Sequence, residues 1–155
     1  MRRYFDHEKL DVYQSELRFV MWVTALLVKI KQQSTDARIA KVSDQLDRAS
    51  LSALLNTAEG NGRRQRRTRA KFFDDTRGSA TECAVCLDAL VAKGVCSGGE
   101  TDEGKQLLLR IASMLTKLIE RFDISSSSSS SSIIREAPDE EGFECENEDE
   151  DEDEH

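Results

Sequence analysis

Residues 102–122, DEGKQLLLRIASMLTKLIERF, decide the fold of this chain. Their large apolar side chains recur at alternating intervals of three and four residues, at Leu108, Ile111, Leu115, Leu118 and Phe122. Because this spacing brings side chains onto one face of an α-helix, the stretch predicts an amphipathic helix that packs against other helices. Thr101, directly before the stretch, is the predicted N-cap.

Three earlier stretches show the same period, at roughly 8–32, 37–60 and 65–93. The second ends at Gly60, and glycine can close a helix in the left-handed conformation. Polar and glycine-rich residues separate the stretches, and the single proline, Pro138, lies outside all four. Since no strand pattern precedes residue 123, the sequence predicts an all-α fold, an up-down-up-down four-helix bundle over residues 1–122.

The composition changes after the fourth stretch. Residues 123–138 contain a run of eight serines and are predicted to form a flexible linker, and residues 139–155 are predicted to form a disordered acidic tail. Residues 123–155 hold fourteen acids and one base, a charge of −13, so the remaining +5 of the total of −8 belongs to the bundle. These opposite charges raise two hypotheses: the tail folds back onto basic residues of the bundle, or it only aids solubility.

The sequence gives no sign of a membrane segment or of export. The longest apolar run, residues 19–28, has ten residues, whereas a helix needs about twenty to cross a bilayer. The N-terminal residues lack the apolar core of a secretory signal. We therefore expect a cytoplasmic protein with reduced thiols.

Residues for catalysis or metal binding are sparse. The two histidines, His7 and His155, lie near the ends of the chain, so no Ser/His/Asp or Cys/His set can be assembled inside the bundle. Cys83 and Cys86 form a C-x-x-C pattern without a second ligand pair, and we expect them to pack in the core. The sequence thus predicts no enzyme, no metal site and no cofactor.

The most informative charged segment is RRQRRTRAK, residues 63–71, in which six of nine positions are basic: Arg63, Arg64, Arg66, Arg67, Arg69 and Lys71. Arginine forks match phosphate geometry, and positive charges at a helix N-terminus are unfavourable unless an anion compensates them. The segment therefore predicts binding of an RNA or DNA backbone. Arg64, Arg67 and Lys71 are the expected phosphate contacts, and Arg63 is the residue that could instead be retained for structure.

Two other interpretations of the basic segment remain open. It could dock an acidic protein partner, in which case the chain is a protein–protein adaptor or scaffold. It could also be a solvated face paired with neighbouring acids or with the tail. From the three- and four-residue offsets we expect Arg63, Arg66, Arg67 and Lys71 to share one side of the third helix.

Three separated motifs carry a resemblance to a known family: FDHEKLDVYQ at 5–14, QLDRASLSALLNTAEGNGR at 45–63 and FFDDTRGSATECAVCLDAL at 72–90. They resemble the ribosomal-RNA intervening-sequence proteins, a family of four-helix bundles that includes the accessory variability determinant of diversity-generating retroelements. The resemblance covers roughly residues 5–122. It implies assembly into a homopentameric ring, and in some members a basic surface that binds nucleic acid or a nucleic-acid enzyme.

The resemblance also marks residues with an implied structural role. The family pattern N-x-A-E-G-x-G-R falls on Asn56, Glu59, Gly60 and Gly62, and G-S-x-x-E falls on Gly78, Ser79 and Glu82. We expect the small residues Gly78, Ser79 and Ala80 to permit close approach of a neighbouring helix. The polar residues Asn56, Glu59 and Glu82 are expected to bond free backbone donors or Arg48. Gln65 stands where the family usually has a serine cap, and is a poorer cap for the third helix.

Overall fold

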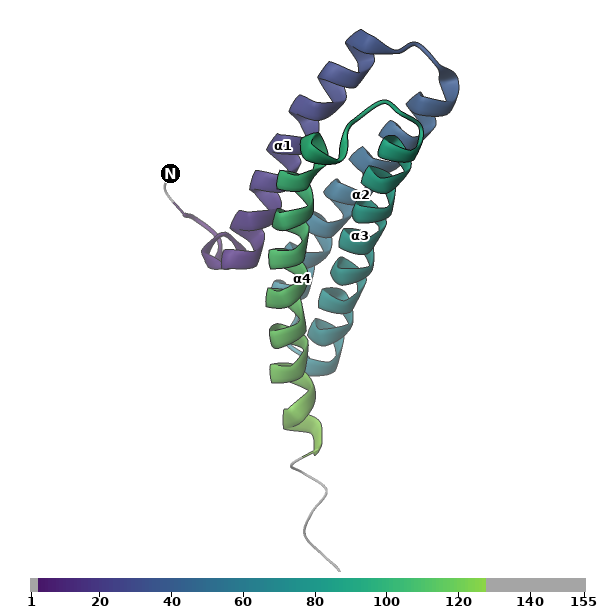
Figure 1. Cartoon of the computed structure of the whole chain (residues 1–155). Helices are drawn as coiled ribbons and strands as arrows, with labels where there is room; N and C mark the ends of the chain where they lie inside the picture. Colours follow the sequence, from purple (N-terminus) through teal and green to yellow (C-terminus); the bar gives the residue numbers. More distant parts are fainter. Residues whose placement is uncertain (1–2, 128–155) are drawn as a thin grey trace, which may run out of the picture.

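The computed structural model describes residues 3–127 of the chain, with side chains through residue 122. It contains a short 3-10 helix and four α-helices, which confirms the predicted all-α bundle (Figure 1). The elements are η1 (Asp6–Lys9), α1 (Asp11–Gln33), α2 (Ala37–Gly62), α3 (Arg66–Ala92) and α4 (Gly98–Ser127). The predicted acidic tail, and the predicted linker beyond residue 127, lie outside the described residues.

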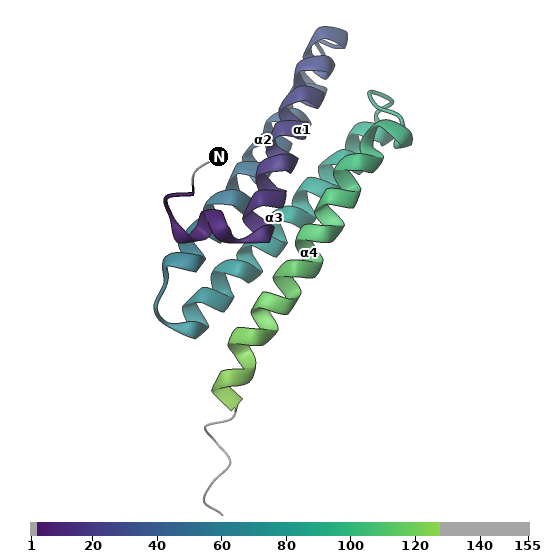
Figure 2. The ribbon, with the colours of Figure 1, turned by 90° about the vertical axis from the view of Figure 1, so that its left-hand side faces the viewer.

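The four helices alternate in direction, and each packs against two neighbours, so that α1 and α4 close the bundle. The α1–α2 and α3–α4 connections lie at one end, as Figure 2 shows. The α2–α3 turn, the start of α1 and the end of α4 lie at the other, which we call the α2–α3 end. This arrangement is the predicted up-down-up-down topology.

The core is formed by the apolar faces that the heptad spacing predicts. Leu108, Ile111 and Leu115 of α4 are all buried, and they pack in one cluster with buried side chains of the other three helices. Cys83, Cys86 and Cys96 belong to the same cluster. Each fully buried large apolar side chain contributes about 2 kcal/mol to folding, so this cluster is the main source of stability.

The first helix begins differently from its prediction. Residues Asp6–Lys9 form the 3-10 helix η1, Leu10 is extended, and α1 starts only at Asp11. η1 packs against α1 and α2, so the chain folds across the side of the bundle before α1 begins. Leu10 itself lines a pocket at the α2–α3 end.

The predicted N-cap of the fourth helix was wrong, because α4 begins at Gly98 and places Thr101 inside its first turn. Thr101 is buried, and its hydroxyl donates to the Gly98 carbonyl. Ser97 and Glu100 instead form a reciprocal cap: the Glu100 backbone N–H donates to Ser97 Oγ over 3.3 Å, and Glu100 Oε2 accepts from the Ser97 N–H over 2.8 Å. At its other end α4 continues to Ser127, into the serine run.

The position of Gly60 indicated that it closes α2 in the left-handed conformation, and this prediction was wrong. The helix continues to Gly62, and Gly94 is the one glycine with positive φ in the part of the chain that the structure describes. Gly60 is buried against α3, where an added Cβ would lie 2.7 Å from Phe72 Cβ. Its small size therefore permits the close packing of α2 on α3.

Gly104 of α4 lies against the indole ring of Trp22, with which an added Cβ would clash, so α1 and α4 also pack closely. Among residues 3–127, no helix has both the length and the apolar character that a bilayer crossing requires.

Candidate nucleic-acid interface

The six basic residues predicted to bind nucleic acid lie together at the α2–α3 end. Arg63 is the C-cap residue of α2, Arg64 lies in the turn, and the other four lie in the first two turns of α3. The structure divides the six into two groups, because three of them make contacts inside the protein.

Arg63 contacts both helices that flank the turn. Its Nη2 forms an ion pair with Glu59, one turn earlier in α2. Its guanidinium carbon lies 5.0 Å from the centroid of the Phe72 ring in α3, within the range of a cation–π interaction. The side chain thus connects the end of α2 to the second turn of α3.

Arg66 and Arg69 connect the start of α3 to the end of α4. The guanidinium carbons of Arg66 and Arg69 lie 5.6 Å and 5.0 Å from the centroid of the Phe122 ring. Arg66 Nη2 also donates to the Arg121 carbonyl over 3.3 Å. These contacts fix the last described turns of α4 beside the α2–α3 turn.

Arg69 additionally satisfies backbone acceptors at the end of α2. Its Nη2 donates to the Asn61 carbonyl over 2.9 Å, and its Nε donates to the Arg63 carbonyl over 3.1 Å. The last carbonyls of a helix have no partner within the helix, so a side-chain donor here stabilises the end of α2. The sequence did not indicate this role, because it depends on the tight turn between α2 and α3.

Arg64, Arg67 and Lys71 form the second group, which we call the basic trio. All three side chains are exposed, and none makes an ion pair, hydrogen bond or ring contact with any residue in the described part of the chain. Arg67 and Lys71 are four residues apart in α3 and therefore neighbours on its surface. The expected grouping of Arg63, Arg66, Arg67 and Lys71 on one side was wrong, because Arg63 and Arg66 turn toward Phe72 and Phe122.

The backbone at the start of α3 adds to the positive field of the basic trio. Gln65 is the N-cap residue, and its side chain accepts no hydrogen bond from a backbone N–H of the first turn, as its poor capping ability predicts; it accepts instead from the Thr68 hydroxyl over 3.1 Å. The free N–H groups of a helix N-terminus carry partial positive charge and bind anions. At this end of α3 the partial charge of the helix N-terminus and the charges of the basic trio are therefore both positive.

Two adjacent pockets lie beside the contacts of Arg66 and Arg69. One, of about 380 Å³, is lined by Leu10, Asn61, Arg66, Arg69, Phe73, Leu118, Arg121 and Phe122. The other, of about 370 Å³, shares three of these residues and adds Lys9 and Lys117. Asp11 also lines this second pocket and Lys9 pairs with Asp6, so the charges around the end of α4 are mixed.

The polar residues of the family motifs lie along the side of the bundle, on α2 and α3. Asn56, Glu59 and Glu82 line a shallow groove between α2 and α3, and each contacts a side chain: Asn56 Nδ2 donates to Ser52, Glu59 pairs with Arg63, and Glu82 accepts from Gln45. The expected bonds to free backbone donors or to Arg48 were wrong.

The small residues of the two motifs differ in how closely they pack against a neighbouring helix. Ser79 Oγ lies 3.2 Å from Ser52 Oγ, so α2 and α3 are close there. An added Cβ at Gly78 or Gly62 would meet nothing within 4 Å, and both residues are exposed. Neither of these two glycines mediates close packing within the described chain.

One carboxyl group is buried in the bundle core. Glu16 of α1 is 2% exposed, and its Oε1 lies 2.7 Å from the hydroxyl of Thr57, which lies 3.3 Å from the hydroxyl of Thr76. Thr76 donates to the Phe72 carbonyl. Burial raises the pKa of Glu16 to about 8, although the hydrogen bond from Thr57 lowers it.

The protonated form of Glu16 fits these contacts better than the carboxylate. Thr57 has one hydroxyl proton and can donate it to either Glu16 or Thr76. A protonated Glu16 can donate to Thr57, which leaves the Thr57 proton for Thr76. Glu16 Oε2 has no partner among the described residues, and a neutral acid makes that orphan less costly than a charge would.

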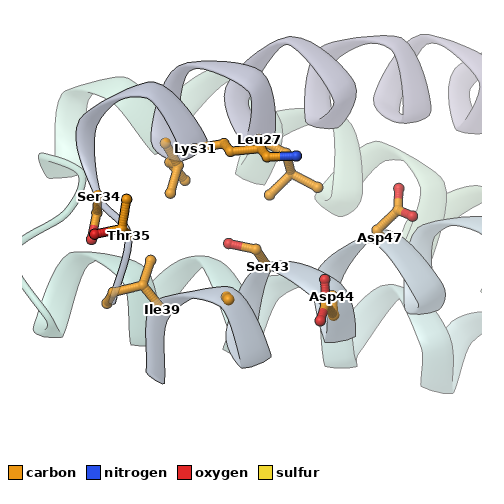
Figure 3. Close-up of a pocket in the computed structure, with 10 residues that line it drawn as sticks. Leu27, Lys31, Ser34, Thr35, Ile39, Ser43, Asp44 and Asp47 are labelled. Atoms are coloured by element: carbon orange, nitrogen blue, oxygen red, sulfur yellow. The ribbon is translucent and has the colours of Figure 1, made fainter. Parts of the chain in front are cut away.

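Figure 3 shows a larger pocket, of about 490 Å³, between the end of α1 and the start of α2. Leu27 and Ile39 form apolar parts of its wall, while Lys31, Asp44 and Asp47 are charged residues at its rim. The pocket is at the opposite end of the bundle from the basic trio and contains none of the predicted site residues. Its mixed charges do not favour a polyanion.

The family described as 23S rRNA-intervening sequence protein matches residues 8–117, which is well over half of the chain. A search of curated proteins gave no match. The matched range includes both glycine-containing motifs and the whole basic segment.

Proposed function

We propose that this chain, which belongs to the family of 23S rRNA-intervening sequence proteins, binds the phosphate backbone of RNA through Arg64, Arg67 and Lys71. The observation that carries the proposal is the basic trio itself: three exposed cations without partners in the described chain, at an uncapped helix N-terminus. Such a site is electrostatically unfavourable until an anion occupies it. The family name favours RNA as that anion, and DNA is the comparison ligand.

Binding of this kind reads backbone charge rather than base sequence. Each phosphate neutralised by a cation releases condensed counterions, so affinity falls steeply with salt. Arg63, Arg66 and Arg69 support the site indirectly, because they hold the turn and the end of α4 in place. Their own positive charge adds to the field.

The test is a titration of labelled single-stranded RNA at several salt concentrations. We expect the triple variant Arg64→Gln, Arg67→Gln, Lys71→Gln to bind RNA at least about tenfold more weakly at 50 mM salt. The negative slope of log K against log salt should become shallower by about 2. Lys31→Gln, Lys41→Gln, Arg110→Gln is the matched control, because it removes the same charge from exposed cations elsewhere. Equal losses in both variants, or no binding of RNA or DNA by the unmodified protein, would overturn the proposal.

We also propose that the chain acts without catalysis and in the cytoplasm. His7 packs between aromatic rings, with ring centroids 5.7 Å from Phe5 and 4.8 Å from Tyr13. Burial raises the pKa of the Cys83 thiol to about 12, which keeps it in the unreactive protonated form. Both features favour structural roles for residues that could otherwise be nucleophiles or bases.

Homo-oligomerisation is a further part of the proposal, with the pentamer as the number implied by the family resemblance. Leu51 and Leu55 of α2 and Val85 of α3 are 50%, 59% and 60% exposed. Burying such side chains against another copy is favourable. Light scattering of the purified protein should give a mass near five times 17.5 kDa, and a monomer mass would contradict it.

A further inference from the structure

We propose that the acidic end of this chain, residues 139–155, docks on the basic trio and competes there with RNA. The inference rests on the function proposed above, because it assigns a second, internal ligand to the same three cations. It is carried by where α4 leaves the bundle, by the length of chain that follows, and by charge.

The end of α4 lies at the same end of the bundle as the basic trio. Arg66 and Arg69, which flank Arg67 in α3, contact the Arg121 carbonyl and the Phe122 ring of α4. In Figure 2 the last turns of α4 descend past the α2–α3 turn. The residues after Ser127 therefore start at the same end of the bundle as the basic trio, rather than about 40 Å away at the other end of the helices.

The acidic segment is within reach. Eleven residues, 128–138, separate the end of α4 from residue 139, and that many residues span at most about 40 Å when fully extended. The basic trio occupies the turn and the first two turns of α3, at the same end of the bundle. An α-helix with its side chains is about 10–12 Å in diameter, so the tether is longer than a path across two helices of the bundle.

Charge makes the two surfaces complementary. Residues 139–155 contain twelve aspartates and glutamates and no lysine or arginine, and seven of the acids are consecutive, at 148–154. Carboxylate oxygens accept the same forked hydrogen bonds from arginine as phosphate oxygens do. The donors that suit an RNA backbone are thus the donors that suit this segment.

Tethering makes even a weak contact effective. A ligand on a short tether acts at an effective concentration on the order of 1 mM. If the segment binds the basic trio with a dissociation constant of about 0.1 mM, RNA affinity falls about tenfold. The effect should disappear at high salt, because exposed charges are then screened.

Docking can be measured directly, without RNA, in the full chain. A nitroxide on Cys145 lies within the acidic segment, and the other three cysteines are buried. We expect it to broaden the backbone amide NMR signals of Arg64, Arg67 and Lys71 at 20 mM salt, and not those of Ser34 and Thr35 at the opposite end. The broadening should vanish at 500 mM salt and in the Arg64→Gln, Arg67→Gln, Lys71→Gln variant. Absent or uniform broadening would overturn the inference.

Competition is measured separately, with a full-length variant in which the seven acids at 148–154 become the corresponding amides. This variant should bind RNA about tenfold more tightly than the unmodified chain at 50 mM salt and equally at 500 mM. If the variant and the unmodified chain bound RNA with equal affinity at 50 mM and at 500 mM salt, the inference would be overturned while RNA binding remained intact. Selective broadening in a protein that binds no RNA would overturn the proposed function and leave the docking itself standing.

Discussion

Glu16 is the single residue with the clearest consequence for stability, because it is a buried acid without an opposite charge beside it. A core acid of this kind is tolerated in its neutral form and is costly when ionised. Its partners, Thr57 and Thr76, come from α2 and α3, so the three side chains form a polar contact among three helices. Helical periodicity did not single out Glu16, because its burial depends on these partners from two other helices.

The stability of the protein should therefore depend on pH through Glu16. Its pKa is about 8 in the folded chain against 4.5 for an ordinary glutamate, so the stabilisation is complete below pH 4.5 and is lost as pH rises to about 8. The loss amounts to at most about 5 kcal/mol. Chemical denaturation at several pH values should show this decline for the unmodified chain and a flatter profile for Glu16→Gln. Glu103→Gln, an exposed control, should keep the decline; a decline that persists in Glu16→Gln would contradict the assignment.

Gly60 and Gly78 make a matched pair that separates close packing from helix propensity. Gly60→Ala forces a Cβ to within 2.7 Å of Phe72 Cβ, and overpacking of this kind costs about 1–3 kcal/mol. Gly78→Ala meets no neighbour and should stabilise α3 by about 1 kcal/mol, because alanine is the better helix former. Thermal unfolding of the two variants under conditions that dissociate any oligomer measures both. Equal effects would mean that Gly60 is not a packing residue.

At the scale of helices, the sequence predicted which residues face the core but was less successful at the ends. The three- and four-residue spacing in 102–122 depends only on helix geometry, and it identified Leu108, Ile111 and Leu115 as buried. The start of α4 depends on where the chain leaves the preceding turn. Ser97 and Glu100 have the spacing of a capping box. These two residues precede 102–122, so the apolar pattern of that stretch does not include them.

The cap of α4 gives a prediction for one helix. Ser97→Ala removes the acceptor for the Glu100 N–H and should lower the free energy of unfolding by about 1 kcal/mol. Ser113→Ala is the control: Ser113 is an exposed residue inside α4 that bonds only the Leu109 carbonyl, and alanine should be neutral or slightly stabilising there. Denaturant titration of both variants provides the comparison. A loss in Ser113→Ala as large as that in Ser97→Ala would contradict the capping role.

At the scale of the whole molecule, the topology brings the functional parts together. Four alternating helices place the α2–α3 turn and the end of α4 at the same end, so the basic segment and the last turns of α4 lie at one end of the bundle. The number of helices was enough to predict this proximity. The division of the six cations was only partly predictable, because the contacts of Arg66 and Arg69 depend on Phe122, which is more than fifty residues away in sequence.

The proposed function divides the six basic residues into three that bind RNA and three that hold the α2–α3 end together. The most direct measurement compares two variants with the same loss of charge: Arg64→Gln, Arg67→Gln, Lys71→Gln and Arg63→Gln, Arg66→Gln, Arg69→Gln. Both the RNA affinity at 50 mM salt and the free energy of unfolding are measured for each.

The first variant should lose at least about tenfold in RNA affinity while its unfolding free energy stays within about 0.5 kcal/mol of the unmodified chain. The second should lose about 2 kcal/mol of stability, from its cation–π contacts and hydrogen bonds, with a smaller loss of RNA affinity. Equal losses of RNA affinity with equal stabilities in the two variants would contradict the division.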